Sequence, residues 1–303
     1  MASIHCLDLL YLDQPRSIAS YLLMGDDGPV LIETGPGSTF DRLTAALADH
    51  GVKLSDIRHA VVTHIHFDHA GAAGLLAQHG ATIAVHEFGA KHLVDPSRLL
   101  ASATRIYGDD MDRLWGRILP IPESQVQPVR DGEVLTFGDI ALKAIETPGH
   151  ARHHHAFSMQ TDEGPVCFAG DAAAMLVPGV PATHYVSLPT PPPEFDREAW
   201  LASLERLKNE HFTAMHLTHF GKVDQVQAHL EAVGQAVIAH SDFVIERAER
   251  GDDEQTILKA YSHWVREHAF AAGVTREQEP HFISRNLLSM NVTGILRYWS
   301  KRT

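Results

Sequence analysis

The stretch Thr63-His64-Ile65-His66-Phe67-Asp68-His69 places four side chains that can bind metal within six residues. It directly follows a short apolar segment, residues 59–63, that is predicted to be a strand. Imidazole and carboxylate groups are typical ligands of zinc, manganese or iron(II). A loop that leaves a strand lets neighbouring side chains converge on one point, whereas within the strand they would alternate between its faces. The stretch therefore predicts a metal site.

The same residues, read as His64-x-His66-x-Asp68-His69, resemble the signature of the metallo-β-lactamase-like hydrolases. Three further ligands of that family follow later strands, and this chain carries a candidate at each place. They are His150 after the strand expected over residues 140–146, Asp171 after 166–169, and His219 after 214–217. His150 ends the string Thr147-Pro148-Gly149-His150, and the resemblance covers roughly residues 15–220.

The resemblance implies a dinuclear metal site. Its ligands would be His64, His66 and His150 on the first ion, Asp68, His69 and His219 on the second, and Asp171 as a bridge. The implied cofactors are two divalent ions, with Zn²⁺ expected first and Mn²⁺ or Fe²⁺ as alternatives. A hydroxide that bridges the ions would be the nucleophile, since bound metal lowers the pKa of water to roughly 7. Asp68 is the implied catalytic residue, which would orient the nucleophile and pass a proton to the leaving group.

Hydrophobic periodicity predicts a mixed α/β protein. The predicted strands are 18–24, 29–34, 59–63, 82–86, 133–137, 140–146, 155–160, 166–169 and 214–217. Helical spacing is found at 39–50 and 71–79, and it dominates after residue 194. This alternation predicts sheets inside and helices outside, and the resemblance makes the fold a four-layer αββα sandwich. We expect a domain over residues 1–222, with a helical insert at about 96–122, and a helical C-terminal extension over 223–303.

The charge of the chain argues against two kinds of partner. Lys and Arg number 25 and Asp and Glu 38, so the formal net charge is −13. An acidic surface repels nucleic acid and anionic membranes. The two cysteines, Cys6 and Cys167, do not make a disulfide framework, and no signal segment or membrane-spanning run is apparent. We expect a cytoplasmic protein that acts on a small-molecule substrate and could form a homodimer.

Departures from particular branches of the resembled family narrow the expected function. Class B β-lactamases usually carry cysteine at the place of Asp171, and quorum-signal lactonases carry tyrosine at the place of Ala174. The glycine-rich and aromatic stretch of glyoxalase II-type thioesterases is missing from residues 172–180. Hydrolysis of an ester, thioester or lactone with an apolar part remains. Two alternatives stay open: a regulatory or binding module that retains the metal site, and a mononuclear iron persulfide dioxygenase.

Other residues carry expectations about packing and support. Glu33 stands in a turn where the family usually has aspartate, and it could support a metal-binding histidine. His153, His154 and His155 lie beside His150 and could support a metal ligand or contact substrate; the alternative is that they alternate between sheet faces without touching metal. Cys167 is expected to be buried. The candidates for an apolar pocket are Tyr107, Met111, Trp115, Met175, Tyr185 and Phe220. The histidines expected at the surface are His5, His50, His79, His92, His229 and His240.

Overall fold

The computed structural model describes residues 2–302 and shows a mixed α/β protein with two sheets and a helical C-terminal part. The predicted fold class is therefore confirmed. Contacts divide the chain into two compact units. Unit 1 comprises the residues up to Glu146 together with His155–Gly170. Unit 2 comprises Thr147–His154 and the residues from Asp171 onward.

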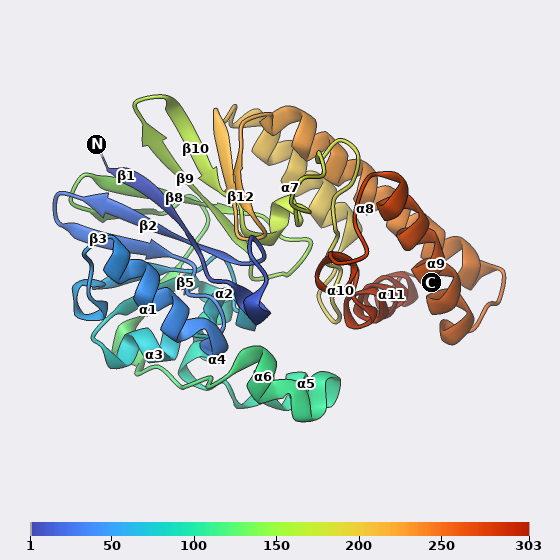
Figure 1. Cartoon of the computed structure of the whole chain (residues 1–303), viewed down its shortest axis with the longest axis horizontal. Coiled ribbons are helices and arrows are strands. Elements are labelled where there is room, and N and C mark those ends of the chain that lie inside the picture. Colours follow the sequence, from blue (N-terminus) through green and yellow to red (C-terminus); the bar gives the residue numbers. More distant parts are fainter. Residues whose placement is uncertain (1, 303) are drawn as a thin grey trace. The chain divides into compact units, whose positions relative to one another are not determined.

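The first sheet of unit 1 has the strand order β1-β2-β3-β4-β5-β6. The first three strands pair antiparallel, and β3 to β6 run parallel (Figure 1). Parallel pairing brings the carboxyl ends of β3, β4 and β5 to one edge, where residues that follow them can meet. The strands are β1 (Ser3–Asp8), β2 (Ala19–Gly25), β3 (Gly28–Ile32), β4 (His59–Val61), β5 (Thr82–His86) and β6 (Val126–Val129).

Six helices of unit 1 connect or follow these strands. Leu43 and Leu47 of α1 and Leu76 of α3 join the buried core of the first sheet, which explains why these apolar spacings form helices. The predicted insert forms two short helices, α5 and α6, as expected. The helices are α1 (Phe40–Asp49), α2 (Phe67–Ala70), α3 (Ala73–Gln78), α4 (Glu87–Val94), α5 (Ser97–Tyr107) and α6 (Met111–Trp115).

The second sheet contributes four antiparallel strands to unit 1, in the order β10-β9-β8-β7. It packs face to face on the first sheet: the ring centroids of Tyr21 and Phe168 lie 5.5 Å apart, and those of His86 and His155 lie 4.3 Å apart. Cys167 is buried in this layer, as predicted. The strands are β7 (Val134–Phe137), β8 (Ile140–Glu146), β9 (His155–Thr161) and β10 (Gly164–Phe168).

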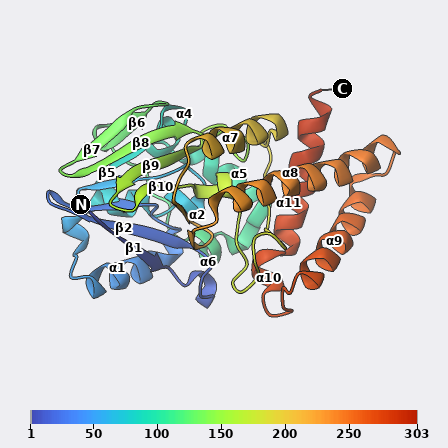
Figure 2. The same cartoon turned by 90° about the horizontal axis from the view of Figure 1, so that it is seen from above.

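Unit 2 is mostly helical. Its longest helix, α8, packs against α7, α9 and α11 (Figure 2), and β11 and β12 form an antiparallel pair. Side chains at the N-caps start three of the helices, because Asp196, Asp253 and Ser284 accept hydrogen bonds from the first turns of α7, α9 and α11. The elements are α7 (Arg197–Asn209), β11 (Ala214–Leu217), β12 (Gly221–Val223), α8 (Val226–Glu249), α9 (Glu254–Ala271), α10 (Glu279–Phe282) and α11 (Arg285–Ser300).

Two histidines of α8 that were expected at the surface are buried, so that prediction was wrong. His229 is 1% exposed and its Nε2 donates to the carbonyl of Ala173, 2.8 Å away. His240 is 6% exposed and its Nδ1 lies 2.6 Å from the hydroxyl of Tyr261. A hydrogen-bonding partner on a neighbouring segment makes burial of an imidazole possible, and sequence periodicity does not reveal such partners. Burial lowers the pKa of His229 and brings the pKa of His240 to about 3.

Among residues 2–302, no helix has both the length and the apolar character required to cross a membrane.

The buried His240 predicts a loss of stability in mild acid. Its pKa is about 3 in the folded protein against an ordinary value of 6.5, so the unfolded chain binds the extra proton and folding stability is lost as pH falls below 6.5. Between pH 7 and pH 5 this residue should lower the free energy of unfolding by about 2 kcal/mol.

Urea unfolding of wild type and His240→Gln at both pH values measures this change. The variant should lose about that much less than wild type, whereas His184→Gln, at an exposed position, should behave like wild type. Equal pH dependence in His240→Gln and wild type would contradict the assignment.

Candidate metal centre

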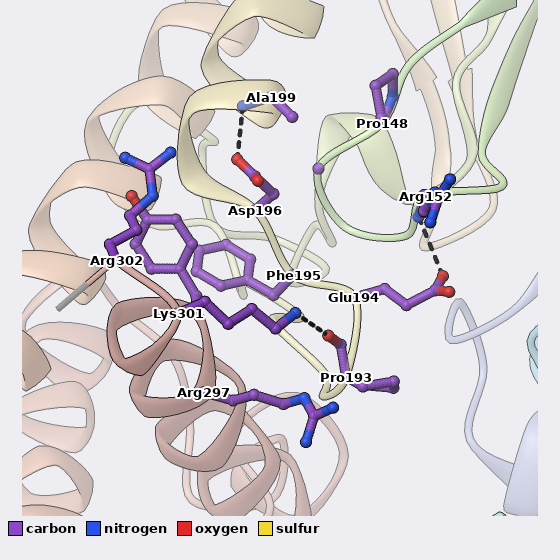
Figure 3. Close-up of a pocket in the computed structure, with 12 residues that line it drawn as sticks. Pro148, Arg152, Pro193, Glu194, Phe195, Asp196, Ala199, Arg297, Lys301 and Arg302 are labelled. Carbon is purple, nitrogen blue, oxygen red and sulfur yellow. Dashed lines mark hydrogen bonds between the residues drawn. The ribbon is translucent and has the colours of Figure 1, made fainter.

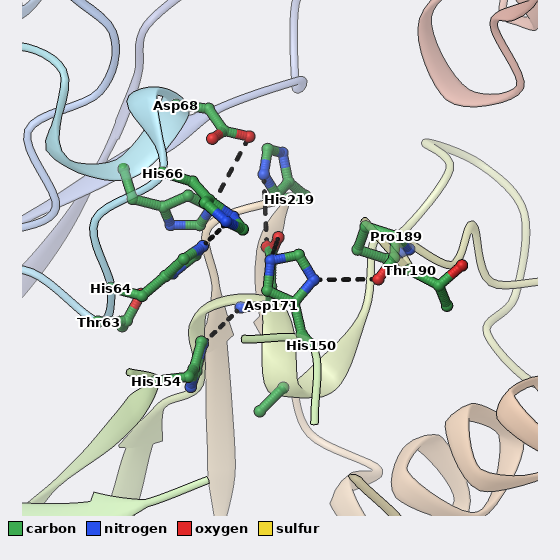
Figure 4. A network of polar contacts seen from close by, with 12 residues as sticks. Thr63, His64, His66, Asp68, His150, His154, Asp171, Pro189, Thr190 and His219 are labelled. Carbon is green, nitrogen blue, oxygen red and sulfur yellow. Dashed lines mark hydrogen bonds and ion pairs between the residues drawn. The ribbon is translucent and has the colours of Figure 1, made fainter. Parts of the chain in front are cut away.

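The His64-x-His66-x-Asp68-His69 stretch lies at the carboxyl end of β4 in unit 1, and α2 begins within it at Phe67. His64 and His69 are fully buried, whereas His66 and Asp68 are partly exposed. Nε2 of His64 lies 2.9 Å from Nδ1 of His66, and the His64 and His69 rings are 4.1 Å apart at their centroids (Figure 4). Asp68 Oδ2 lies 3.8 Å from Nε2 of His69. The structure thus brings these four side chains together within unit 1.

A buried carboxylate at the end of β3 orients two of these histidines. Glu33 is fully buried and accepts from the backbone N–H of Thr63 (3.2 Å), the Thr63 hydroxyl (2.6 Å) and Nδ1 of His69 (2.9 Å). Because the Thr63 hydroxyl donates to Glu33, its oxygen is left to accept from Nδ1 of His64, 3.1 Å away. Both imidazoles therefore carry their proton on Nδ1 and present the lone pair of Nε2. Glu33 supports a histidine of the stretch, as predicted.

Aromatic side chains surround Asp68. The pKa values of the Tyr11 and Tyr107 phenols are raised, by burial first and then by the negative charge of Asp68. The Trp115 ring lies 6.0 Å from that of Tyr11, 5.2 Å from that of Tyr107 and 6.0 Å from that of Phe67. We call these four residues the aromatic cluster. The α5–α6 insert supplies two of them, so it places apolar surface beside the carboxylate.

The three later candidates lie together in unit 2. His150 follows β8 at a loop, Asp171 lies in the short 3₁₀ helix Gly170–Ala173, and His219 follows β11. All three are buried. Asp171 Oδ2 is 3.3 Å from Nε2 of His150, and its Oδ1 is 3.5 Å from Nε2 of His219 (Figure 4). One carboxylate therefore faces two imidazoles with its two oxygens.

The orientation of His150 shows that this arrangement fits a cation. Nδ1 of His150 donates to the carbonyl of Pro189, 3.0 Å away, so the neutral ring presents the lone pair of Nε2 to Asp171. A lone pair and a carboxylate oxygen repel each other unless positive charge, a proton or a metal ion, lies between them. Nitrogen and oxygen atoms of this kind are the ligands that zinc and similar divalent ions take. The residues present fit the metal that the family resemblance implies.

His154 has a supporting role, which is one of the two possibilities that the sequence left open for it. Its Nε2 accepts from the backbone N–H of Asp171 (3.1 Å), and its Nδ1 lies 2.8 Å from the Thr147 hydroxyl. It therefore fixes the start of the turn that carries Asp171. Its neighbours serve elsewhere: His153 pairs with Glu194 at 3.0 Å, and His155 is part of β9. The signal in the sequence for this role was a histidine four residues after the predicted ligand His150.

A cavity of about 490 Å³ lies in unit 2 next to the loop that carries His150 (Figure 3). Pro148 and Gly149, which precede His150, line one side. Arg297 of α11 and Lys301, the residue directly after that helix, line the other side. Lys301 donates to the carbonyl of Pro193 at 3.2 Å. The cavity is lined by Pro148, Gly149, Arg152, Pro193, Glu194, Phe195, Asp196, Ala199, Arg297, Tyr298, Lys301 and Arg302. Four cations against two carboxylates make it locally positive on an acidic chain.

The fold, with donor atoms at strand ends, defines a metal-binding α/β sandwich. The family model of the metallo-beta-lactamase superfamily matches residues 13–219, which is more than half of the chain. The chain belongs to this superfamily.

Individual relatives agree with this assignment. The chain is 29% identical over 196 residues to the metallo-beta-lactamase fold-containing protein ST1585 of Sulfurisphaera tokodaii, covering 63% of this chain and 68% of the relative. It is 27% identical over 160 residues to an atrochrysone carboxyl ACP thioesterase of Aspergillus fumigatus, covering 52% of this chain but only 40% of the relative. The metallo-beta-lactamase family protein TTHA1429 of Thermus thermophilus shares the fold with a TM-score of 0.72 at 22% identity, covering 99% of this chain and 93% of the other.

Removal of the Glu33 charge should weaken metal binding. Glu33→Gln keeps the size of the side chain but removes the negative charge that the Thr63 hydroxyl and Nδ1 of His69 share at Oε1, and its NH₂ group cannot accept from the backbone N–H of Thr63 as Oε2 does. We expect the dissociation constant for Zn²⁺ to rise about 10–100-fold, the usual effect of losing a partner that orients a ligand. A competition titration against a chromophoric chelator measures it. Glu163→Gln, at an exposed loop position, is the control, and equal Zn²⁺ affinity in both variants would refute the role of Glu33.

Proposed function

We propose that the chain is a hydrolase that uses two divalent metal ions. In this proposal His64, His66 and His150 hold one ion, Asp68, His69 and His219 hold the other, and Asp171 is shared. The observation that carries it is the set of buried imidazoles whose Nδ1 protons are engaged by Glu33, Thr63 and the Pro189 carbonyl. Because Nδ1 of each ring is fixed as a hydrogen-bond donor, Nε2 of the same ring keeps a free lone pair with which to bind metal.

The substrate we propose is an ester, thioester or lactone with an apolar part, and a thioester in particular. The aromatic cluster beside Asp68 offers an apolar surface for an acyl group. Relatives that are thioesterases support the choice, although the chain spans 40% of the Aspergillus fumigatus enzyme and 36% of the thioesterase pkgB of Emericella nidulans. The cationic cavity of unit 2 suits a thiol portion that carries phosphate or carboxylate.

The roles of the side chains follow from their positions. Bound divalent ions would polarise the acyl carbonyl as Lewis acids and would lower the pKa of a bound water molecule to roughly 7. Glu33 and Thr63 hold His69 and His64 in one tautomer, and the Pro189 carbonyl does the same for His150. The aromatic cluster excludes water from the acyl group. Asp68, partly exposed and beside this cluster, is placed to take a proton at its carboxylate and return it to the departing thiol or alcohol.

Metal content and a substrate panel test the proposal. Protein purified without added metal should contain close to two equivalents of divalent metal, and it should hydrolyse an apolar acyl thioester faster than a phosphodiester. Anionic thioesters should show a lower KM than neutral ones with the same acyl group. One equivalent of iron with oxygen-dependent persulfide turnover would instead identify the dioxygenase alternative. Two equivalents of metal without hydrolysis of any member of the panel would favour a binding module.

The role of Asp68 makes a separate prediction. Asp68→Asn preserves shape but removes both the charge and the basicity, so kcat should fall by about two to four orders of magnitude, the scale of general acid–base catalysis. The loss of turnover should exceed the loss of metal measured on the same samples. Asp109→Asn is the matched control, because Asp109 is an exposed carboxylate of the same unit. Near-normal kcat in Asp68→Asn with both ions bound would overturn the mechanism.

A further inference from the structure

The proline-rich loop that orients His150 has few backbone N–H groups with which to form hydrogen bonds of its own. Prolines occupy positions 189, 191, 192 and 193, so the only backbone N–H between Pro189 and Pro193 belongs to Thr190. The carbonyl that accepts from His150 Nδ1 belongs to Pro189. The stretch therefore cannot form the ladder of backbone hydrogen bonds of a strand or helix. Its Pro191 carbonyl accepts from the backbone N–H of Phe195, and side chains from other elements supply further bonds.

One amide side chain on α11 fills this role. Oδ1 of Asn291 accepts from the backbone N–H of Thr190 at 2.8 Å, and its Nδ2 donates to the carbonyl of Leu188 at 2.7 Å. The amide thus binds the residues on both sides of Pro189. Asn291 and Leu188 are 1% exposed and Thr190 is fully buried, so water cannot replace these bonds.

The second N–H of the Asn291 amide forms a hydrogen bond that fixes the orientation of the amide. Its second N–H donates to the hydroxyl of Tyr261 on α9 at 3.3 Å, and that hydroxyl also lies 2.6 Å from Nδ1 of His240 on α8. The oxygen and both N–H groups of the amide therefore have partners, which leaves it one orientation. Three C-terminal helices, α8, α9 and α11, contribute to fixing it.

A glycine one turn further along α11 brings the helix close to the loop. A Cβ at Gly294 would overlap the carbonyl oxygen of Thr190, so only glycine permits this approach. Asn291 and Gly294 are three residues apart and lie on the same face of α11. The helix therefore contacts the loop through the hydrogen bonds of Asn291 and through the close approach that Gly294 allows.

We propose that Asn291 is a positioning residue for the metal ligand His150, acting through the Pro189 carbonyl. The effect on metal binding rests on the proposed function, whereas the hydrogen bonds of Asn291 do not depend on it. It gives the C-terminal helices a chemical role, because they set the tautomer and direction of one ligand through the loop they bind. Loss of the amide would free the Pro189 carbonyl and leave Nδ1 of His150 without a fixed acceptor.

The first readout needs no metal. In metal-free wild type a proton takes the place of the ion between Nε2 of His150 and Asp171, and long-range ¹H–¹⁵N NMR correlations should show that Nδ1 is protonated as well. Asn291→Leu, similar in size but unable to bond the loop, should show a mixture that includes the tautomer protonated on Nε2 alone. Tyr261→Phe is the control: it removes a partner of the amide and should lower Tm, but both loop bonds remain and Nδ1 of His150 should stay protonated.

The second readout is Zn²⁺ affinity, measured at a temperature where circular dichroism shows each variant folded. The dissociation constant should rise about 10–100-fold in Asn291→Leu and stay within about twofold of wild type in Tyr261→Phe. A lower Tm with unchanged tautomer and unchanged Zn²⁺ affinity in Asn291→Leu would overturn the inference, because Asn291 would then be purely structural.

A further variant covers the case in which Asn291→Leu does not fold. Gly294→Ala retains the amide but displaces the Thr190 carbonyl, and it should shift both readouts in the same direction. Wild-type values in a folded Gly294→Ala would count against the inference. If wild type itself binds no divalent metal, the proposed function fails, while the tautomer measurement still decides the role of Asn291.

Discussion

The bonds to the buried carboxylate of Glu33 are the interaction on which the arrangement of unit 1 depends. Two donors of Thr63, which follows β4, and one of His69 in α2 converge on it, so the end of β3, the segment after β4 and α2 are fixed relative to one another. A carboxylate without such donors would be too costly to bury. Glu33 also has a positive φ of 61°, a strained conformation for a residue with a side chain. The hydrogen bonds offset both costs, and two candidate ligands, His64 and His69, gain a fixed tautomer.

In unit 2, neutral groups orient the candidate ligands instead. A backbone carbonyl orients His150, an imidazole accepts from the backbone N–H of Asp171, and His229 and Trp200 donate to the carbonyls of the residues that follow Asp171. Hydrogen bonds to neutral acceptors are roughly half as strong as those to charged ones. The geometry of this set therefore depends on how firmly the carbonyls are held. That requirement explains why buried polar side chains of α7, α8 and α11 reach toward these loops.

The sequence predicted the parts whose determinants are local. The strands at 140–146 and 214–217 have the predicted bounds, and the insert forms two helices. The strands β1, β6 and β12 were not predicted, because each lies at the edge of its sheet and is stabilised by pairing with one neighbour, β2, β5 or β11, more than by its own apolar pattern. The four candidate ligands of the first stretch lie within six residues and can therefore be read from the sequence, whereas Asp171, His150 and His219 were proposed from the resemblance. His154 was one of three adjacent histidines that could support a ligand, and the sequence could not single it out because its partner lies 17 residues away. Asn291 was missed as a support because its partners lie about 100 residues away.

Asn291 nevertheless leaves a trace in the sequence that depends on no homologue. It falls three residues after Leu288 and four before Ile295, on the apolar face of the predicted helix, where aliphatic side chains are expected. A neutral amide at such a position loses free energy unless all its hydrogen bonds are made, so its presence implies partners on another segment. A segment short of N–H donors and rich in prolines is the complementary signal, and residues 188–193 are such a segment. The two anomalies explain each other: the amide supplies the bonds that the loop cannot make for itself. By the same reasoning, the glycine at 294, a poor helix former inside a helix, marks where the loop comes closest.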